Sequence, residues 1–243
     1  MSDNLRQYRA IRDALTPGSP GEPTGRLAQH LAPLAACISG IVASKSTQLP
    51  TVASHVPGGT KPESRVKRLA RWVDNDTITA DVYFCPSAQV LLAQLALQTL
   101  VLVIDGSVVG RGGVALRIHV VYKGRALPLA WLVRQGKQGQ VPADLPIAVI
   151  EQGQRQRPAG AQVVLLGAGA CDGTTLQHTI QDSQWSSVVR TGSHLTVRWD
   201  GETFRCETVA SCITPGTVVE LTAVRVTQEA YGPVMLLCCW AKG

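Results

Sequence analysis

The chain has 243 residues, of which 45% are hydrophobic, and carries a formal net charge of +6. This length and composition indicate a soluble globular protein with one large domain, or a medium domain with an appendage. The longest apolar stretch, residues 90–104, is interrupted by polar residues and is too short to span a membrane. The N-terminus lacks the apolar segment of a secretory signal, so we expect a cytoplasmic protein.

The charge is unevenly distributed along the chain. Residues 1–75 hold ten Lys/Arg against five Asp/Glu, whereas residues 76–243 hold thirteen against twelve. A basic excess in the first third suggests a polyanionic partner, although a solvated basic face has the same composition. The seven cysteines form no Cys-x-x-Cys pair and no histidine lies at zinc-ligand spacing, so we expect reduced thiols and no zinc site.

The first 80 residues are typical of short helices separated by Pro/Gly-rich breakers. Residues 1–25 are predicted to form an N-terminal helix and a linker, because TPGSPGEPTG continues neither a helix nor a strand. Residues 26–80 are predicted to form a helical region that binds DNA. Within it, apolar residues recur at helical spacing from Leu27 to Ala43, with Pro33 as a candidate start of the helix, and a short helix is expected at 49–56.

The stretch PESRVKRLARWV, residues 62–73, predicts an amphipathic basic helix. Its apolar face would hold Val66, Leu69 and Val73. A helix of this kind can lie against a phosphate backbone, although a basic helix on the surface of any domain has the same pattern. The candidate DNA-binding residues, which lie largely off the apolar face, are Arg65, Lys67, Arg68 and Arg71.

Residues 81–192 alternate between strand and helix signals. A helix over 86–98 leads to a strand over 100–104 that ends at Asp105, and a hairpin turns at Lys123-Gly124. A helix over 145–156, a strand over 162–166, a helix over 174–183 and a strand over 185–190 follow. This order predicts an α/β fold in which helices cover both faces of a mixed sheet. Residues 193–243, with a turn at Asp200-Gly201, predict an all-β meander.

Four stretches together resemble the catalytic domain of bacterial insertion-sequence transposases of the DDE type. They are LVIDGSVVGRG, IHVVYKGRALPLAW, VVLLGAGACDGTTLQ and WSSVVRTGS, and the resemblance runs from about residue 34 to the C-terminus. It implies a ribonuclease-H-like fold, binding of transposon ends, and phosphodiester hydrolysis and strand transfer that depend on two Mg²⁺ ions held by three acids. The β meander corresponds to an insertion in that fold.

The resemblance assigns the first acid to Asp105 and the slot of the second acid to Ala168. Asp172, four residues later, is a conceivable substitute, but its place before Gly-Thr-Thr favours a helix cap. The helix that bears the third acid in the family is absent, so the chain is expected to be C-terminally truncated, to bind Mg²⁺ poorly and to be catalytically defective. An uncovered sheet face is then expected, with association into a homo-oligomer or with a full-length copy.

The sequence therefore supports a transposase-family protein that recognises DNA ends and lacks strand-transfer activity. The alternative is a non-catalytic DNA-binding remnant that interferes with an active transposase. A nucleotide-binding enzyme is a third class, because Gly167-x-Gly169 follows a strand. It fits poorly, since the third glycine of a dinucleotide loop would fall at Asp172 and no Lys-Ser or Lys-Thr follows.

Overall fold

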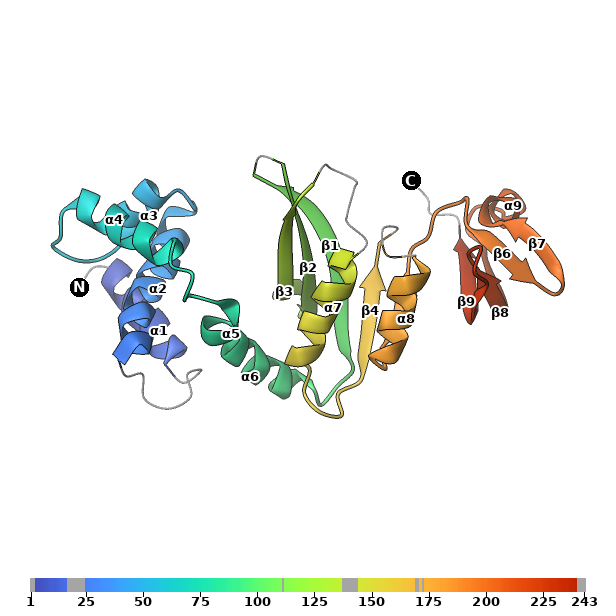
Figure 1. Cartoon of the computed structure of the whole chain (residues 1–243), viewed down its shortest axis with the longest axis horizontal. Helices are drawn as coiled ribbons and strands as arrows, with labels where there is room; N and C mark the ends of the chain where they lie inside the picture. The colour runs from blue at the N-terminus through green and yellow to red at the C-terminus, as the bar shows by residue number, and fades with distance from the viewer. Residues whose placement is uncertain are drawn as a thin grey trace. The chain divides into compact units, whose positions relative to one another are not determined.

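The computed structural model describes residues 3–16, 25–110, 112–136, 144–168, 171 and 173–239. It shows a mixed α/β protein with one mixed and one antiparallel sheet among these residues. The chain forms two compact units, Met1–Gln94 and Leu95–Gly243 (Figure 1).

The first unit is helical. Its core contains Ala36, Val52, Ala53, Val56 and Leu69, all nearly inaccessible to solvent. The helices are α1 (Asp3–Leu15), α2 (Gly25–Ser44), α3 (Leu49–His55), α4 (Pro62–Val73), α5 (Ala80–Tyr83) and α6 (Cys85–Leu95), the last of which ends one residue beyond the unit boundary.

Two expectations for these helices were wrong. The helix α2 begins at Gly25, in agreement with the apolar spacing from Leu27 but not with a start near Pro33, which lies inside it. Val73 is 55% exposed and does not extend the apolar face of α4. Trp72 anchors α4 instead, because its indole Nε1 donates a hydrogen bond to the carbonyl of His30 on α2, at 3.0 Å. Trp72, which the sequence pattern did not place on the apolar face, therefore makes the contact that the pattern assigned to Val73.

The helices α2 and α3 cross at Gly40. A Cβ atom on Gly40 would lie 2.6 Å from both the carbonyl oxygen and the Cγ1 atom of Val52. The backbone of α2 can therefore approach α3 only because position 40 has no side chain. This contact sets the packing distance at the centre of the helical core.

The helix α2 is long and apolar enough to cross a membrane by length and composition alone. Five of its residues are buried within the helical unit, and α1, α3 and α4 pack against it. Core helices of water-soluble proteins pass the same test. The contacts of α2 are those of a core helix in this unit.

The second unit contains a five-stranded mixed sheet with the strand order β3-β2-β1-β4-β5. The antiparallel strands β1, β2 and β3 form a meander, and β4 and β5 run parallel to β1. The predicted turn at Lys123-Gly124 is confirmed, and both residues have positive φ. The elements are β1 (Leu100–Val109), β2 (Gly113–Tyr122), β3 (Arg125–Gln135), α7 (Asp144–Gln156), β4 (Val163–Gly167), α8 (Thr174–Asp182) and β5 (Ser186–Val189).

Both α7 and α8 lie on the same face of this sheet. A Cβ on Gly153 of α7 would lie 3.2 Å from Ile118 of β2. On α8, Gln177 accepts a hydrogen bond from Ser187 of β5, at 3.2 Å. Ile118 pairs with Ile104, and Leu165 pairs with Ser187. Ile104 and Leu165 point to the same side of the sheet by strand pairing and alternation. Ile118 and Ser187 therefore share one face.

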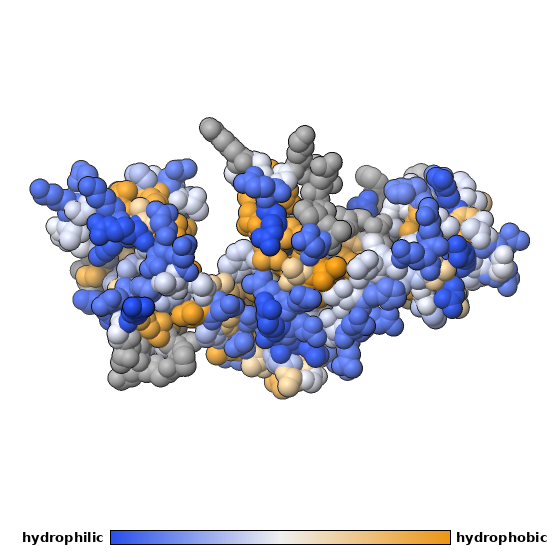
Figure 2. Space-filling view, viewed as in Figure 1, coloured by the Kyte–Doolittle hydropathy of each residue, from blue (hydrophilic) through white to orange (hydrophobic). Residues whose placement is uncertain are grey.

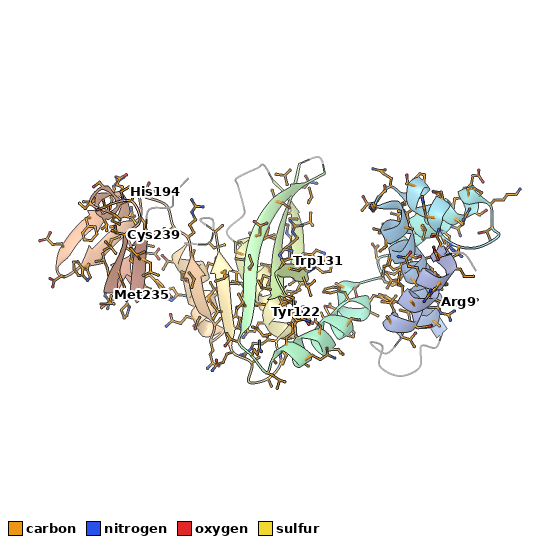
Figure 3. The ribbon with its side chains drawn as sticks, turned by 180° about the vertical axis from the view of Figure 1, so that it is seen from behind. Arg9, Tyr122, Trp131, His194, Met235 and Cys239 are labelled. Carbon is orange, nitrogen blue, oxygen red and sulfur yellow. The ribbon has the colours of Figure 1, made fainter. Side chains whose placement is uncertain are left out.

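The expectation of helices on both faces was therefore wrong for the described part of the chain. The opposite face, here called the open face, carries no described helix of this unit, and its valines include Val188, which is 59% exposed, and Val133, which is 51% exposed. An uncovered sheet face was expected, and these exposures confirm it within the described residues. Figure 3, which views the chain from behind, shows this side of the sheet.

The remaining residues form an antiparallel sheet with the order β7-β6-β8-β9. The predicted hairpin at Asp200-Gly201 joins β6 and β7, and both residues have positive φ. The expectation of an all-β meander was wrong in one respect, because a short helix, α9, follows β7. The elements are β6 (Thr196–Trp199), β7 (Glu202–Arg205), α9 (Cys206–Ser211), β8 (Val218–Val226) and β9 (Tyr231–Cys239).

Candidate functional site

Asp105 lies in the middle of β1 rather than at its end, because β1 continues through an antiparallel ladder with β2 as far as Val109. The parallel pairing of β1 with β4, however, stops at the pair Ile104–Gly167. Asp105 is therefore the first β1 residue beyond β4. Its side chain is exposed and makes no hydrogen bond or ion pair with another described residue.

Ala168 follows Gly167 directly and is also exposed. The pairing of Ile104 with Gly167 brings Ala168 level with Asp105 on the neighbouring strand. Helix α8 has Gly173 at its N-cap position, while Asp172, proposed as the cap, lies outside the described residues. Within the described ranges, no group of three or more His, Cys, Asp and Glu residues is placed to hold a metal ion.

Arg117 of β2 lies directly opposite Asp105. Its guanidinium turns along the strand, where Nη2 donates a hydrogen bond to the Ser107 hydroxyl at 2.8 Å. Its Nε is buried without a hydrogen-bond partner among the described residues. A guanidinium has five N–H donors, so Arg117 retains donor capacity beside Asp105.

These pairings define a transverse row across all five strands. Trp131 of β3 pairs with Arg117, Arg117 pairs with Asp105, and Asp105 lies level with Ala168. Because Gly167 pairs with Val189 and accepts a hydrogen bond from the Arg190 amide at 2.9 Å, Arg190 completes the row beside Ala168. We call these five residues the open-face row: Trp131, Arg117, Asp105, Ala168 and Arg190.

Trp131, Arg117 and Asp105 lie on the open face, because strand alternation separates them from the residues that contact α7 and α8. Ala168 and Arg190 are the first residues after β4 and β5, level with Asp105. Figure 3 labels Trp131 on β3 in the view from behind. The sequence interpretation singled out Asp105 and Ala168 and missed Arg117, Arg190 and Trp131. The available signal was the alternation of each strand, but using it required the strand order and the register.

His119 follows Arg117 on the same face of β2. Burial lowers the pKa of His119, and the positive charge of Arg117 lowers it further, whereas the carboxylate of Asp105 acts in the opposite direction. Asp105, Arg117 and His119 therefore lie within electrostatic reach of one another. The imidazole is held toward its neutral form by this environment.

The described residues of the row do not fit a pair of magnesium ions. Mg²⁺ takes oxygen ligands, and a two-ion site requires several carboxylates. The row offers the single carboxylate of Asp105, a methyl group at Ala168 and guanidinium groups at Arg117 and Arg190. With one carboxylate and two cations, this donor set favours an anion over a divalent cation.

A second candidate surface lies on α4 of the helical unit. Lys67, Arg68 and Arg71 are exposed, and at about 100° per residue they fall within an arc of about 100° on the helix. Over α4, Figure 2 shows mainly hydrophilic side chains. We call these three residues the α4 basic face.

Arg65 differs from the other candidate DNA-binding residues. It is partly buried, and its Nη1 donates a hydrogen bond to the carbonyl oxygen of Val56, at 2.6 Å. Val56 is the C-cap of α3, so Arg65 satisfies a carbonyl at a helix end. The contact assigns Arg65 to holding α3 and α4 together.

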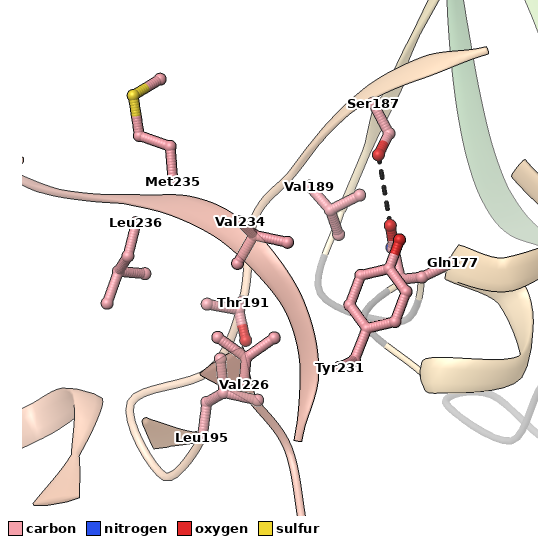
Figure 4. Close-up of a pocket in the computed structure, with 10 residues that line it drawn as sticks. All are labelled: Gln177, Ser187, Val189, Thr191, Leu195, Val226, Tyr231, Val234, Met235 and Leu236. Atoms are coloured by element: carbon pink, nitrogen blue, oxygen red, sulfur yellow. Dashed lines mark hydrogen bonds between the residues drawn. The ribbon is translucent and has the colours of Figure 1, made fainter. Parts of the chain in front are cut away.

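A hollow lies between β5, α8 and the second sheet within the second unit (Figure 4). Its polar groups include Gln177, which accepts the hydrogen bond from Ser187, and Tyr231, whose ring packs edge-on against His178 with centroids 5.0 Å apart. Its wall also contains Val189, Val226 and other apolar side chains, and no charged group is among the residues that line it. This hollow therefore presents no ionic group, and the titratable side chain in its lining is the Tyr231 phenol, whose pKa is raised by burial.

No protein-family model and no curated protein matches the sequence. Two groups of described residues offer charged side chains to a ligand: the open-face row and the α4 basic face.

Proposed function

We propose that this chain is a DNA-binding protein related to DDE transposases and that it lacks their strand-transfer activity. The observation that carries the binding part is the α4 basic face, in which three exposed cations lie on one side of a helix anchored by Leu69 and Trp72. Cations clustered along one side of a helix are a typical electrostatic footprint of nucleic-acid binding, and their contacts to phosphates fix the protein's orientation on DNA.

The relation to transposases draws support from the strand order. In the family that the sequence resembles, the first acid is on strand one and the second follows strand four. Here β1 and β4 are neighbours, and Asp105 lies level with Ala168. This adjacency of two residues that are 63 positions apart in the chain supports the proposed relation.

The loss of strand transfer rests on the chemistry of the row. Transposition requires carboxylates that hold two divalent ions against the scissile phosphate. One carboxylate, in a row that also holds Arg117 and Arg190, gives those ions too few ligands. A protein that binds DNA ends without cleaving them would act as an inhibitor of an active transposase, and this is the second candidate function.

The test measures binding of the full chain to a fluorescein-labelled 24-base-pair duplex of arbitrary sequence, with EDTA present. Replacing Lys67, Arg68 and Arg71 with Gln should weaken binding and reduce the salt slope by about 2.7, since each phosphate contact contributes about 0.9. The matched control replaces three exposed arginines outside α4 and causes the same loss of charge: Arg125, Arg134 and Arg155.

If both triple variants weaken binding equally, the α4 basic face has no specific role and the binding assignment fails. A second arm incubates the labelled duplex with Mg²⁺ or Mn²⁺ and looks for nicked products. We expect none. Cleavage that disappears in the Asp105→Asn variant would overturn the proposed loss of activity.

A further inference from the structure

The open-face row differs from the acidic cluster that the resemblance implies in the sign of its charge. Arg117 and Arg190 bracket Asp105 and Ala168, so the row carries two positive charges and one negative charge. An acid at position 168 would cancel the excess. Because alanine stands there, position 168 contributes no charge between the two arginines.

From this charge pattern we propose that the open-face row is a second nucleic-acid site, which binds the backbone of single-stranded DNA without a divalent metal ion. The proposal rests on the proposed function, because it takes DNA as the ligand, but it uses different residues. In it, Arg117 and Arg190 contact phosphate oxygens and Trp131 stacks on a base.

The dimensions of the sheet suit this ligand. Arg117 and Arg190 are separated by three strand spacings of about 4.8 Å, or about 14 Å, a span over which a strand places several phosphates. On Arg117, Nη2 donates to Ser107 and Nε is buried, so Nη1 is the nitrogen left to donate to a ligand. The Arg190 side chain is exposed and makes no hydrogen bond with a described residue.

The surroundings favour a single strand over a duplex. Trp131 stands at one end of the row, and the exposed Val133 and Val188 lie on the same face. Proteins that bind single strands combine cations along the backbone with aromatic platforms for bases, because unpaired bases expose their ring faces. A duplex keeps its bases stacked inside and cannot use Trp131 in this way.

The experiment measures binding of fluorescein-labelled octathymidylate to the full chain in EDTA. Arg117→Gln and Arg190→Gln should each weaken binding about tenfold, and each should reduce the salt slope by about 0.7. Trp131→Leu should weaken it at least about fivefold. Arg134→Gln is the matched control, because Arg134 is an exposed arginine of β3 that pairs with Val114 on the helix-covered face.

Ala168→Asp gives the sharpest test, because it restores a negative charge between the two arginines. We expect it to weaken octathymidylate binding about tenfold in EDTA, whereas Ala168→Asn, of the same shape, should leave binding within about twofold. Thermal melting followed by circular dichroism establishes that each variant is folded. If Arg117→Gln unfolds the chain, Arg190→Gln and the position-168 pair carry the test.

The proposal is overturned if octathymidylate does not bind in EDTA, or if Arg134→Gln weakens binding as much as Arg190→Gln. It is also overturned if Ala168→Asp has no effect. These outcomes are separate from those of the proposed function, because duplex binding depends on Lys67, Arg68 and Arg71. Loss of duplex binding in the α4 variants, with octathymidylate binding intact, supports both assignments.

Discussion

Ile104 of β1 pairs in parallel with Gly167 of β4, and this is the last pair between the two strands. The next residues, Asp105 and Ala168, consequently emerge side by side at the end of the ladder. A Cβ on Gly167 would lie 3.5 Å from Ile104 and 2.9 Å from the Cβ of Cys171, so the strand end is closely packed. The pairing of Ile104 with Gly167 therefore brings Asp105, the carboxylate of the open-face row, beside Ala168.

Ala168→Asp should increase the affinity for a divalent ion. The new carboxylate would stand about one strand spacing, about 4.8 Å, from Asp105, close enough to share a cation. We expect Mn²⁺ to bind about tenfold more tightly, which corresponds to about 1.4 kcal/mol. Calorimetric titration of Mn²⁺ measures this change. The gain should disappear in Ala168→Asn and when Asp105→Asn is added, and a gain that persists without Asp105 would contradict the pairing.

Gly40→Ala should destabilise the helical unit by about 1–3 kcal/mol, since the added methyl group would overlap Val52. Alanine stabilises a helix relative to glycine by about 1 kcal/mol, so the same substitution at an exposed helical glycine would raise the free energy of unfolding instead of lowering it. Urea unfolding measures the difference. Gly59→Ala is the control, because a Cβ there meets no atom within 4 Å. Equal stability of the two variants would show that α2 and α3 are not in close contact.

Arg65→Gln should reduce stability while Lys67→Gln should not. Arg65 donates a charge-assisted hydrogen bond to the Val56 carbonyl, and loss of such a bond costs about 1.5–3 kcal/mol. Lys67 is exposed, so its substitution should change the free energy of unfolding by less than about 0.5 kcal/mol. Lys67→Gln should nevertheless weaken duplex binding. The assignment fails if the two substitutions have the same effect on unfolding.

Stability should depend on the protonation of His119. Burial and then Arg117 lower its pKa in the folded state, while the unfolded value is about 6.5. Below pH 6.5 the unfolded chain takes up the proton first, so this stabilisation is present above pH 6.5 and is lost as the pH falls through the folded pKa. The stability advantage of the wild type over His119→Gln, from urea unfolding in EDTA, should therefore shrink between pH 7.5 and pH 5.

The same group offers an internal check by nuclear magnetic resonance. Arg117→Gln removes a nearby positive charge and should raise the titration midpoint of His119, whereas Asp105→Asn should lower it. Opposite shifts are expected because the two neighbours carry opposite charges. Shifts of the same sign would contradict the opposite effects of Arg117 and Asp105 on the pKa of His119.

Cys238 should react with iodoacetamide more slowly than Cys212 and Cys239. Burial and the neighbouring Cys206 raise the pKa of Cys238 to about 11, and the thiolate is the reactive form. Cys212 and Cys239 are exposed and should be alkylated at least about tenfold faster at pH 8. Peptide mapping by mass spectrometry measures each rate, and in urea the differences should vanish. Equal rates for Cys238 and Cys212 in the folded chain would contradict the burial of Cys238.

Local features of the fold were predictable because they depend on neighbouring residues. Lys123-Gly124 and Asp200-Gly201 supply the positive φ angles of tight turns, and α8 begins at Thr174 as predicted. The pair of strands on either side of Lys123-Gly124 was equally visible. Each of these features is determined within a few residues, where backbone sterics and periodicity dominate.

The features that matter for function were set by contacts between distant parts of the chain. Only the structure revealed that β1 continues past Asp105, that Arg65 binds a carbonyl of α3, and that α7 and α8 share one face. These follow from packing that periodicity does not encode.

The sequence by itself determined most of the helices and strands, the two tight turns and the identity of the side chains at Asp105 and Ala168. The tertiary structure alone decided which residues stand beside them. Strand order and register bring Arg117, Asp105 and Arg190 into one row. A shift of one residue in any of the three strand pairings would send a side chain to the other face. Register depends on how whole strands bury their apolar faces, which is a property of the assembled sheet.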